Sequence, residues 1–183
     1  MNFFKKKELK VILWSYGPQG KTNLLYRGLK GNKDITPKML PTIGFNVETI
    51  TFNDININFW DIGGACKIKE LRHHYFPSSD AIIFLIDSSE QVIASDLDFQ
   101  DNFQELQKCI NIIEDKPLLI AITKIDIRKT STLDIINAYQ LYNLFKRKQK
   151  FGIIECSSFT LEGIKEIEYW LSSIVKNKTV FKL

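Results

Sequence analysis

The chain is poor in cysteine and histidine, and it has no long hydrophobic run. Three of its 183 residues are cysteine and two are histidine. The cysteines are odd in number and lack the spacing of metal ligands, so neither a disulfide framework nor a zinc site is expected. No apolar stretch approaches the roughly 20 residues that a membrane-spanning helix requires, and no apolar signal-peptide core opens the sequence. These absences predict a cytoplasmic protein that is neither secreted nor membrane-spanning.

Signals for lipid attachment are also lacking. Residue 2 is Asn2, whereas N-myristoylation requires glycine there, and residues 180–183 carry no prenylation signal. Phe3 and Phe4 lie beside a run of lysines, but so short a segment is marginal as a helix in water. We therefore expect at most transient, peripheral contact with an organelle membrane.

The remaining composition is that of an ordinary soluble domain. Hydrophobic residues make up 44% and charged residues 25% of the chain. A length of 183 residues suits one domain, spanning residues 1–183. The formal charge is +4, with basic clusters at residues 5–7 and 146–150. A solvated face is favoured for these clusters over a lipid or nucleic-acid contact, so no nucleic-acid partner is expected. We also expect the protein to be a monomer.

Short apolar runs alternate with helical patterns along the chain. The runs have the length and content of buried parallel strands, and hydrophobic spacings of three and four residues indicate helices. The predicted strands are residues 11–14, 81–86, 118–122 and, more weakly, 151–155, and the helical patterns cover residues 99–113 and 164–174.

Residues 44–53 and 55–62 indicate a hairpin around Asn53-Asp54. The hairpin adds an antiparallel edge to an otherwise parallel sheet. Right-handed crossovers then place helices on both faces and ligand-binding loops at the carboxyl ends of the strands. The sequence therefore predicts an α/β fold with a mostly parallel sheet and one antiparallel edge strand.

A phosphate-binding loop follows the first predicted strand. Residues 15–22 read Ser-Tyr-Gly-Pro-Gln-Gly-Lys-Thr and run into a helical stretch that begins at Asn23. Backbone amides and the helix N-terminus suit phosphate oxygens, Lys21 neutralises the outer phosphates, and the Thr22 hydroxyl is suited to Mg²⁺. Ser15 stands where the motif has glycine. The predicted nucleotide contacts in this segment are Ser15, Gly17, Gln19, Gly20, Lys21, Thr22 and Asn23.

Two further strings carry a family resemblance. Residues 41–48 read Pro-Thr-Ile-Gly-Phe-Asn-Val-Glu, and residues 60–64 read Trp-Asp-Ile-Gly-Gly. They resemble the two switch segments of the Arf and Arf-like small GTPases, and the resemblance extends over essentially the whole chain. It implies a Ras-like P-loop NTPase fold with a six-stranded sheet, and a GTP/GDP switch that uses Mg²⁺.

The resemblance also implies roles for residues in the switch segments. Thr42 would reach Mg²⁺ and the terminal phosphate, so Thr22 and Thr42 are the predicted metal ligands. Asp61 would hold the metal through water, and Gly64 would donate its amide to the same phosphate. These contacts require the third phosphate, so hydrolysis would release both segments. Lys21, Thr42 and Gly64 are the predicted catalytic residues.

Two departures from the family predict slow hydrolysis. Ala65 stands where the family usually has a glutamine that orients the attacking water. Pro18 lies where small GTPases direct a backbone N–H at the bridging phosphate oxygen, and proline has no N–H. An aimed donor is worth about 100-fold to 1,000-fold in rate. The alternative is that Pro18 only stiffens the turn.

The base-binding element resembles the Asn-Lys-x-Asp motif of the family. Residues 123–126 read Thr-Lys-Ile-Asp. Asp126 can accept both guanine N1–H and N2–H, which adenine cannot match, and Lys124 can cover the ring with its alkyl stem. Thr123 replaces asparagine, so the tether between base loop and phosphate loop depends on a hydroxyl. Ser158, in the Glu-Cys-Ser-Ser string, is the residue chosen to donate its amide to guanine O6.

The sequence leaves three classes of function open. The leading hypothesis is a guanine-nucleotide switch in intracellular or vesicular trafficking, which contacts effectors, an exchange factor and an activating protein through residues 41–76. Cys66 and Arg72 depart from the family there, so specific partners do not carry over. The alternative is a pseudo-GTPase scaffold that binds nucleotide without turnover or not at all. A P-loop kinase or ATPase would need a different base loop and is disfavoured.

Overall fold

The structure is a computed structural model, and it describes most of the chain. The described residues are 7–34, 44–52, 54–63, 72–92, 96–113, 116–146 and 150–180.

Six strands form a single sheet in the order β2-β3-β1-β4-β5-β6. All neighbouring pairs are parallel except β2 and β3, which pair antiparallel at one edge. The predicted α/β fold, with its parallel strands and antiparallel edge, is therefore confirmed. The strands are β1 (Lys7–Trp14), β2 (Phe45–Phe52), β3 (Ile55–Ile62), β4 (Ala81–Asp87), β5 (Leu118–Thr123) and β6 (Phe151–Glu155).

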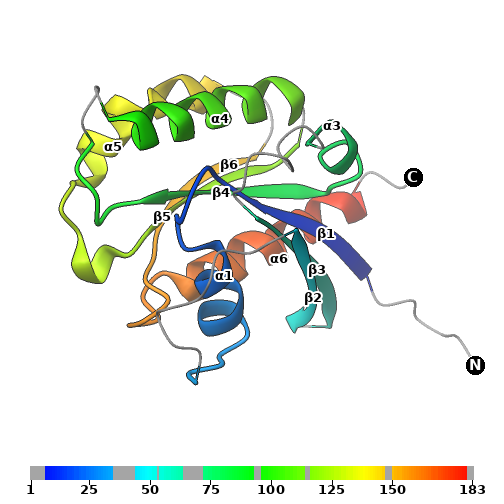
Figure 1. The fold of residues 1–183 in the computed structure, drawn as a ribbon. Coiled ribbons are helices and arrows are strands. Elements are labelled where there is room, and N and C mark those ends of the chain that lie inside the picture. The colour runs from blue at the N-terminus through cyan, green and yellow to red at the C-terminus, as the bar shows by residue number, and fades with distance from the viewer. Residues whose placement is uncertain are drawn as a thin grey trace, which may run out of the picture.

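Helices cover both faces of this sheet, as Figure 1 shows. The helices α4 and α5 lie on one face, and α1 and α6 lie on the other. Within the described residues, no helix combines the length and the hydrophobicity needed to cross a bilayer. The helical elements are α1 (Lys21–Asn23), η1 (Leu24–Leu29), α3 (Arg72–Tyr75), α4 (Leu97–Ile113), η2 (Ile125–Ile127), α5 (Thr132–Ala138), η3 (Leu141–Lys146) and α6 (Ile164–Val180).

Two hydrophobic cores lie on opposite faces of the sheet. Val11 and Leu13 of β1 pack in the core beneath η1 and α6, whereas Ile12 and Trp14 pack in the core beneath α4 and α5. Every residue of β4 and β5 is buried, because a parallel strand covered on both faces has no solvent side. This explains why these strands appear in the sequence as continuous apolar runs.

The hairpin follows the predicted pattern, whereas the first helix departs from a regular α-helix. Phe45, Val47 and Thr49 share one face of β2, as their spacing predicts, and that face is exposed to solvent. The helix after the phosphate loop begins at Lys21 and widens into a π-helix at Leu24–Leu29. The Lys30 N–H bonds the Leu25 carbonyl at 2.9 Å, a spacing of five residues.

Gly163 provides a stability test of the turn before α6. It has a φ of +74°, and a Cβ at this position would lie 1.8 Å from the Glu155 carbonyl oxygen. Gly163→Ala should lower the free energy of unfolding by about 3 kcal/mol or more, because strain and overlap add. Gly31→Ala is the matched control, since Gly31 has a φ of +71° and no neighbour within 4 Å. It should cost about 1 kcal/mol. Urea unfolding measures both, and equal losses would contradict the overlap.

Candidate functional site

The loops that follow four strands meet at one edge of the sheet. Parallel pairing of β1, β4, β5 and β6 brings their carboxyl ends together. The segments that follow these strands are residues 15–20, 88–92, 124–127 and 156–163. The predicted phosphate loop and both predicted base elements are among them.

The phosphate loop is folded around the ammonium group of Lys21. Gly17 and Gly20 adopt left-handed backbone angles, with φ of +64° and +91°. The buried Lys21 Nζ donates to Ser15 Oγ at 2.7 Å and to the Gly17 carbonyl at 3.2 Å. Ser15, which replaces the usual glycine, therefore supplies an acceptor that holds the lysine in the loop.

Three hydrogen bonds attach this loop to neighbouring elements. The Tyr16 amide donates to Asn102 Oδ1 on α4 at 2.8 Å, and the Asp87 amide donates to Gln19 Oε1 at 2.7 Å. The Thr123 hydroxyl donates to the Gln19 carbonyl at 2.8 Å. The side chain of Gln19 thus anchors the loop to the end of β4, and its predicted nucleotide contact is left to the backbone amide.

A hydroxyl and a carboxylate meet beside the phosphate loop. Thr22 Oγ1 donates to Asp61 Oδ2 at 2.7 Å, and Asp61 is fully buried at the end of β3. Oxygen groups of this kind are the ligands that Mg²⁺ prefers. Thr42, Gly64 and Ala65 lie outside the residues that the structure describes, and their roles stay predictions.

The base side of the site is built around Asp126. Ser157 Oγ donates to Asp126 Oδ1 at 2.6 Å, which orients an otherwise exposed carboxylate. Lys124 has a φ of +58° and forms an ion pair with Asp87. A Cβ at Gly20 would lie 4.0 Å from Lys124 Cε, so the lysine stem passes close to the phosphate loop.

Thr123 preserves the tether that asparagine would make. Its hydroxyl bonds the Gln19 carbonyl directly, so the phosphate loop and the base loop are joined by one side chain. Lys21 and Asp126 therefore follow two loops that share this hydrogen bond. That they hold the two ends of one nucleotide stays a prediction.

The sequence analysis missed three supporting residues. Asp87 holds Lys124, Asn102 holds the Tyr16 amide, and Ser157 holds Asp126. Each had a signal in the sequence. Asp87 ends a buried strand, Asn102 is a polar residue on the core side of a helix, and Ser157 directly precedes the chosen Ser158.

Cys156 lies at the start of the base-side loop but does not add a nucleophile. It is buried, and burial raises the pKa of its thiol to about 12. The thiol therefore stays protonated at neutral pH, whereas nucleophilic cysteines act as thiolates.

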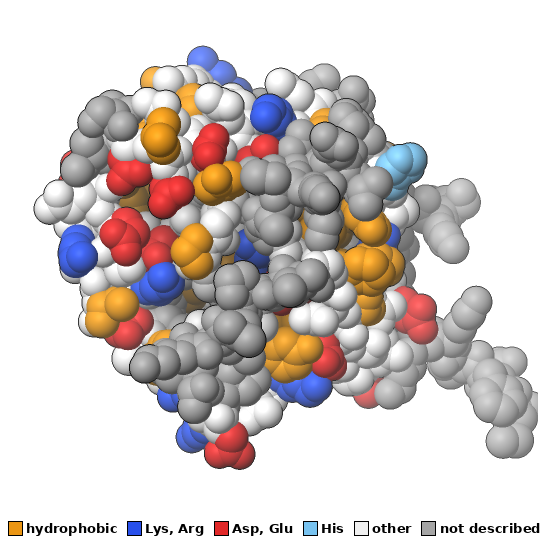
Figure 2. All heavy atoms as spheres, viewed as in Figure 1, with side chains coloured by type: hydrophobic (Ala, Val, Ile, Leu, Met, Phe, Trp, Pro, Cys, Tyr) orange, Lys and Arg blue, Asp and Glu red, His pale blue; other side chains and the backbone are white. Residues whose placement is uncertain are grey.

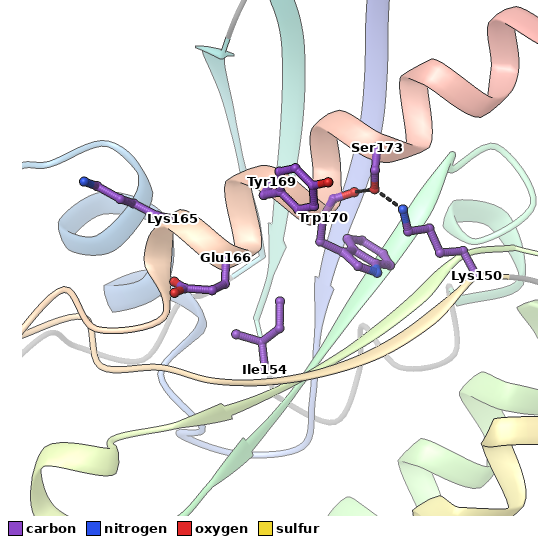
Figure 3. A pocket seen from close by; sticks show the side chains of 7 residues that line it. All are labelled: Lys150, Ile154, Lys165, Glu166, Tyr169, Trp170 and Ser173. Carbon is purple, nitrogen blue, oxygen red and sulfur yellow. Dashed lines mark hydrogen bonds between the residues drawn. The ribbon is translucent and has the colours of Figure 1, made fainter.

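A separate hollow lies between β6 and α6, away from the phosphate loop. It has a volume of about 470 Å³, and Figure 3 shows Trp170 between Ile154 and Lys150 along its wall. Gly152 lets the indole approach β6 closely, since a Cβ there would be 3.1 Å from Trp170 Nε1. Lys150 bonds Ser173 at one end. Among the residues that the structure describes, its lining includes none from the phosphate loop or from residues 156–163.

The two ends of the loop cluster offer different chemistry. At one end a lysine, a glycine-rich backbone and a helix start suit phosphate oxygens. At the other end an oriented carboxylate suits a pair of ring N–H donors. A Thr-Asp pair lies beside the first end and suits a divalent cation. This is the arrangement expected for a magnesium nucleotide.

Comparison with known proteins assigns the chain to a family. A model described as "ADP-ribosylation factor family" matches residues 1–175. The chain belongs to the ADP-ribosylation factor (Arf) family. It is thus an Arf-like small GTPase, in a family whose members bind GTP and GDP and hydrolyse GTP.

Individual relatives support the assignment. ADP-ribosylation factor J of Dictyostelium discoideum is 31% identical over 183 residues, which cover 96% of this chain and 90% of the relative. ADP-ribosylation factor K of the same organism is 30% identical with the same coverage. The structure of the Arl6 BBS3 small GTPase of Trypanosoma brucei, solved with the nucleotide analogue GppNp, superposes with a TM-score of 0.75. It shares 21% identity and covers 93% of this chain and 99% of its own, which shows the common fold.

The tether of this Arf-family chain can be tested at Thr123. Thr123→Val keeps the shape but removes the hydroxyl, so the bond to the Gln19 carbonyl is lost. It should lower the free energy of unfolding by about 1–2 kcal/mol. Thr123→Ser keeps the hydroxyl and is the control. Urea denaturation of both variants distinguishes the cause, and equal losses would show that the methyl group matters instead.

Proposed function

We propose that the chain is a guanine-nucleotide switch that cycles between GTP and GDP and regulates intracellular or vesicular trafficking through effector recruitment. The observation that carries this proposal is the tether between Thr123 and Gln19, which joins a phosphate loop to a loop that bears an oriented Asp126. A protein that holds phosphates alone would not need the second loop in this position.

Each part of the nucleotide has a residue suited to it. Phosphates are bound by the hydroxyl or backbone amides of the predicted contacts and by the Lys21 ammonium group, which exchanges its contacts in the loop for phosphate oxygens. These contacts are Ser15, Gly17, Gln19, Gly20, Lys21, Thr22 and Asn23. Mg²⁺ is held by Thr22 and Thr42, with Asp61 acting through water, and when bound it neutralises phosphate charge. The buried Thr22–Asp61 pair fits this role.

The guanine base is recognised by the carboxylate of Asp126. Ser157 donates to one of its two oxygens and so fixes the orientation of the carboxylate. Lys124 covers the ring and stays in place through its ion pair with Asp87. Ser158 donates its amide to guanine O6, and Thr123 completes the site through its contact with the phosphate loop.

The switch is read out on an aromatic surface between the two switch segments. Phe45 stacks on Trp60 with ring centroids 5.4 Å apart, and Tyr75 lies 5.7 Å from Trp60. Lys10 Nζ lies 4.0 Å from the centre of the Trp60 ring. Phe45 remains 47% exposed, and Figure 2 shows hydrophobic side chains gathered where β2, β3 and α3 lie.

An exposed aromatic surface of this kind is suited to protein partners. Residues 41–76 contain Phe45, Trp60 and Tyr75, and they bind effectors, an exchange factor and an activating protein. Partner choice then follows from whether the two switch segments are held against the nucleotide.

Hydrolysis is intrinsically slow in this proposal. Pro18 lies exposed in the phosphate loop, and it lacks the N–H that would stabilise charge on the leaving phosphate. Ala65 has no group to orient water. Bound GTP is therefore hydrolysed slowly unless a partner supplies the missing groups.

Guanine selectivity is tested by exchanging Asp126 for Asn. The amide can no longer accept two N–H donors, so affinity for GDP should fall by about 100-fold or more. Xanthosine diphosphate, which carries a carbonyl in place of the 2-amino group, should gain affinity. Competition binding with Mg²⁺ present measures both ligands. Asp98→Asn is the control for charge, since Asp98 is exposed on α4. Unchanged selectivity would place the base elsewhere.

The slow hydrolysis is tested by restoring the missing groups. Ala65→Gln and Pro18→Ala should each raise the single-turnover rate, by about 10-fold to 1,000-fold, because they return an orienting amide and a backbone donor. Phosphate release from preloaded GTP measures the rates. A wild-type rate equal to that of both variants would contradict the assigned defects. Failure of wild-type protein to bind guanine nucleotide at millimolar concentration would favour the scaffold alternative.

A further inference from the structure

The π-helix η1 and the loop after β6 pack against each other beside the base site. A Cβ at Gly28 would lie 2.9 Å from Ile164 Cδ1 and 3.7 Å from Ser158 Oγ. A side chain here would require Ile164 of α6 to move, so Gly28 lets η1 lie close to α6 and to Ser158. The two segments belong to opposite ends of the chain, and their contact places η1 against the loop that carries Ser158.

Arg27, the neighbour of Gly28, contacts Phe159 across this junction. Its guanidinium carbon lies 4.2 Å from the centre of the Phe159 ring, a distance typical of cation–π stacking. Its Nη1 also donates to the Lys33 carbonyl at 3.0 Å. Arg27 therefore connects η1, the loop that follows β6 and the segment that leads toward the first switch segment.

The loop that carries Phe159 is held rigidly against Asp126. The Phe159 amide donates to Ser157 Oγ at 3.1 Å, and the same hydroxyl donates to Asp126 Oδ1 at 2.6 Å. The Leu161 amide bonds the Ser157 carbonyl at 2.9 Å, and the Ser157 amide bonds the Glu162 carbonyl at 3.0 Å. These bonds fix the backbone of Phe159, which directly follows Ser158 in the loop.

Phe159 nevertheless remains 40% exposed. Arg27 lies over the ring, yet a large part of the side chain stays in contact with solvent. An aromatic ring that is fixed in place and incompletely covered is suited to pack against a flat ligand, since every nucleobase presents a π-face.

We propose that Arg27 and Phe159 form a clasp on the base side of the site that slows nucleotide release. This inference rests on the proposed function, because the ligand is the guanine nucleotide. The Phe159 ring packs against the purine. Arg27 is a positioning residue that holds the ring and the Lys33 backbone together, so the base cannot leave until both contacts open.

The direct test is the release of tritiated GDP from Phe159→Ala. Loss of the ring should raise the dissociation rate about tenfold, equivalent to about 1.4 kcal/mol, with little change in the association rate. Phe159→Trp should retain slow release. Leu161→Ala is the matched control, because Leu161 is also 40% exposed and lies on the same loop. Release from Phe159→Ala at the wild-type rate would overturn the clasp.

A second comparison separates stacking from indirect displacement of Asp126. Inosine diphosphate lacks the 2-amino group that the carboxylate accepts, but its purine has the same face. If the ring stacks on the base, Phe159→Ala should accelerate release of GDP and inosine diphosphate by the same factor. A larger effect on GDP would show that the substitution acts through Asp126, and it would overturn the clasp.

The role of Arg27 is tested with Arg27→Lys, which keeps the charge but removes the planar group that stacks. It should raise the GDP release rate about threefold on the wild-type background and have no added effect with Phe159→Ala, because it acts through the ring. Additive effects would contradict positioning. Wild-type protein that binds no guanine nucleotide would overturn the proposed function together with the clasp. Wild-type protein that binds GDP, with release unchanged by Phe159→Ala, would overturn the clasp alone.

Discussion

The hydrogen bond from Thr123 to the Gln19 carbonyl is the contact on which the site depends. Parallel pairing brings the carboxyl ends of β1 and β5 to the same edge of the sheet, with β4 between them. Pairing alone sets only the distance between strands. The short reach of a threonine hydroxyl requires the phosphate loop to lie directly against the base loop, and Gln19 strengthens this by accepting from the end of β4.

The substitutions in this chain affect binding and hydrolysis differently. Ser15 replaces a glycine but accepts a bond from Lys21, and Thr123 replaces an asparagine but keeps its tether. Both therefore maintain the structure of a nucleotide site. Pro18 offers no such compensation, because a missing N–H cannot be supplied by its own side chain. These substitutions therefore fit the proposal that the chain binds nucleotide but hydrolyses GTP slowly.

Two aromatic surfaces lie on different sides of the site. Phe45, Trp60 and Tyr75 lie on the hairpin side, where their rings contact one another and form the proposed partner surface. Phe159 lies on the base side, where Arg27 links it to the carbonyl of Lys33. In the sequence, the residues that follow Lys33 lead to the first switch segment.

The sequence by itself determined the order of the strands, the antiparallel hairpin and the helices α4 and α6, and it located the segments predicted to bind phosphate and base, because hydrophobic periodicity and short motifs are local properties. It did not predict α5. It placed the strands within a few residues of their ends, and it identified Lys21, Thr22 and Asp126 at one edge. It did not find Asn102, Asp87 or Ser157, whose partners are distant in the chain or visible only in three dimensions. The π-helix and the approach of Arg27 to Phe159 were decided by tertiary packing, since they depend on Gly28 meeting Ile164 across more than half of the chain.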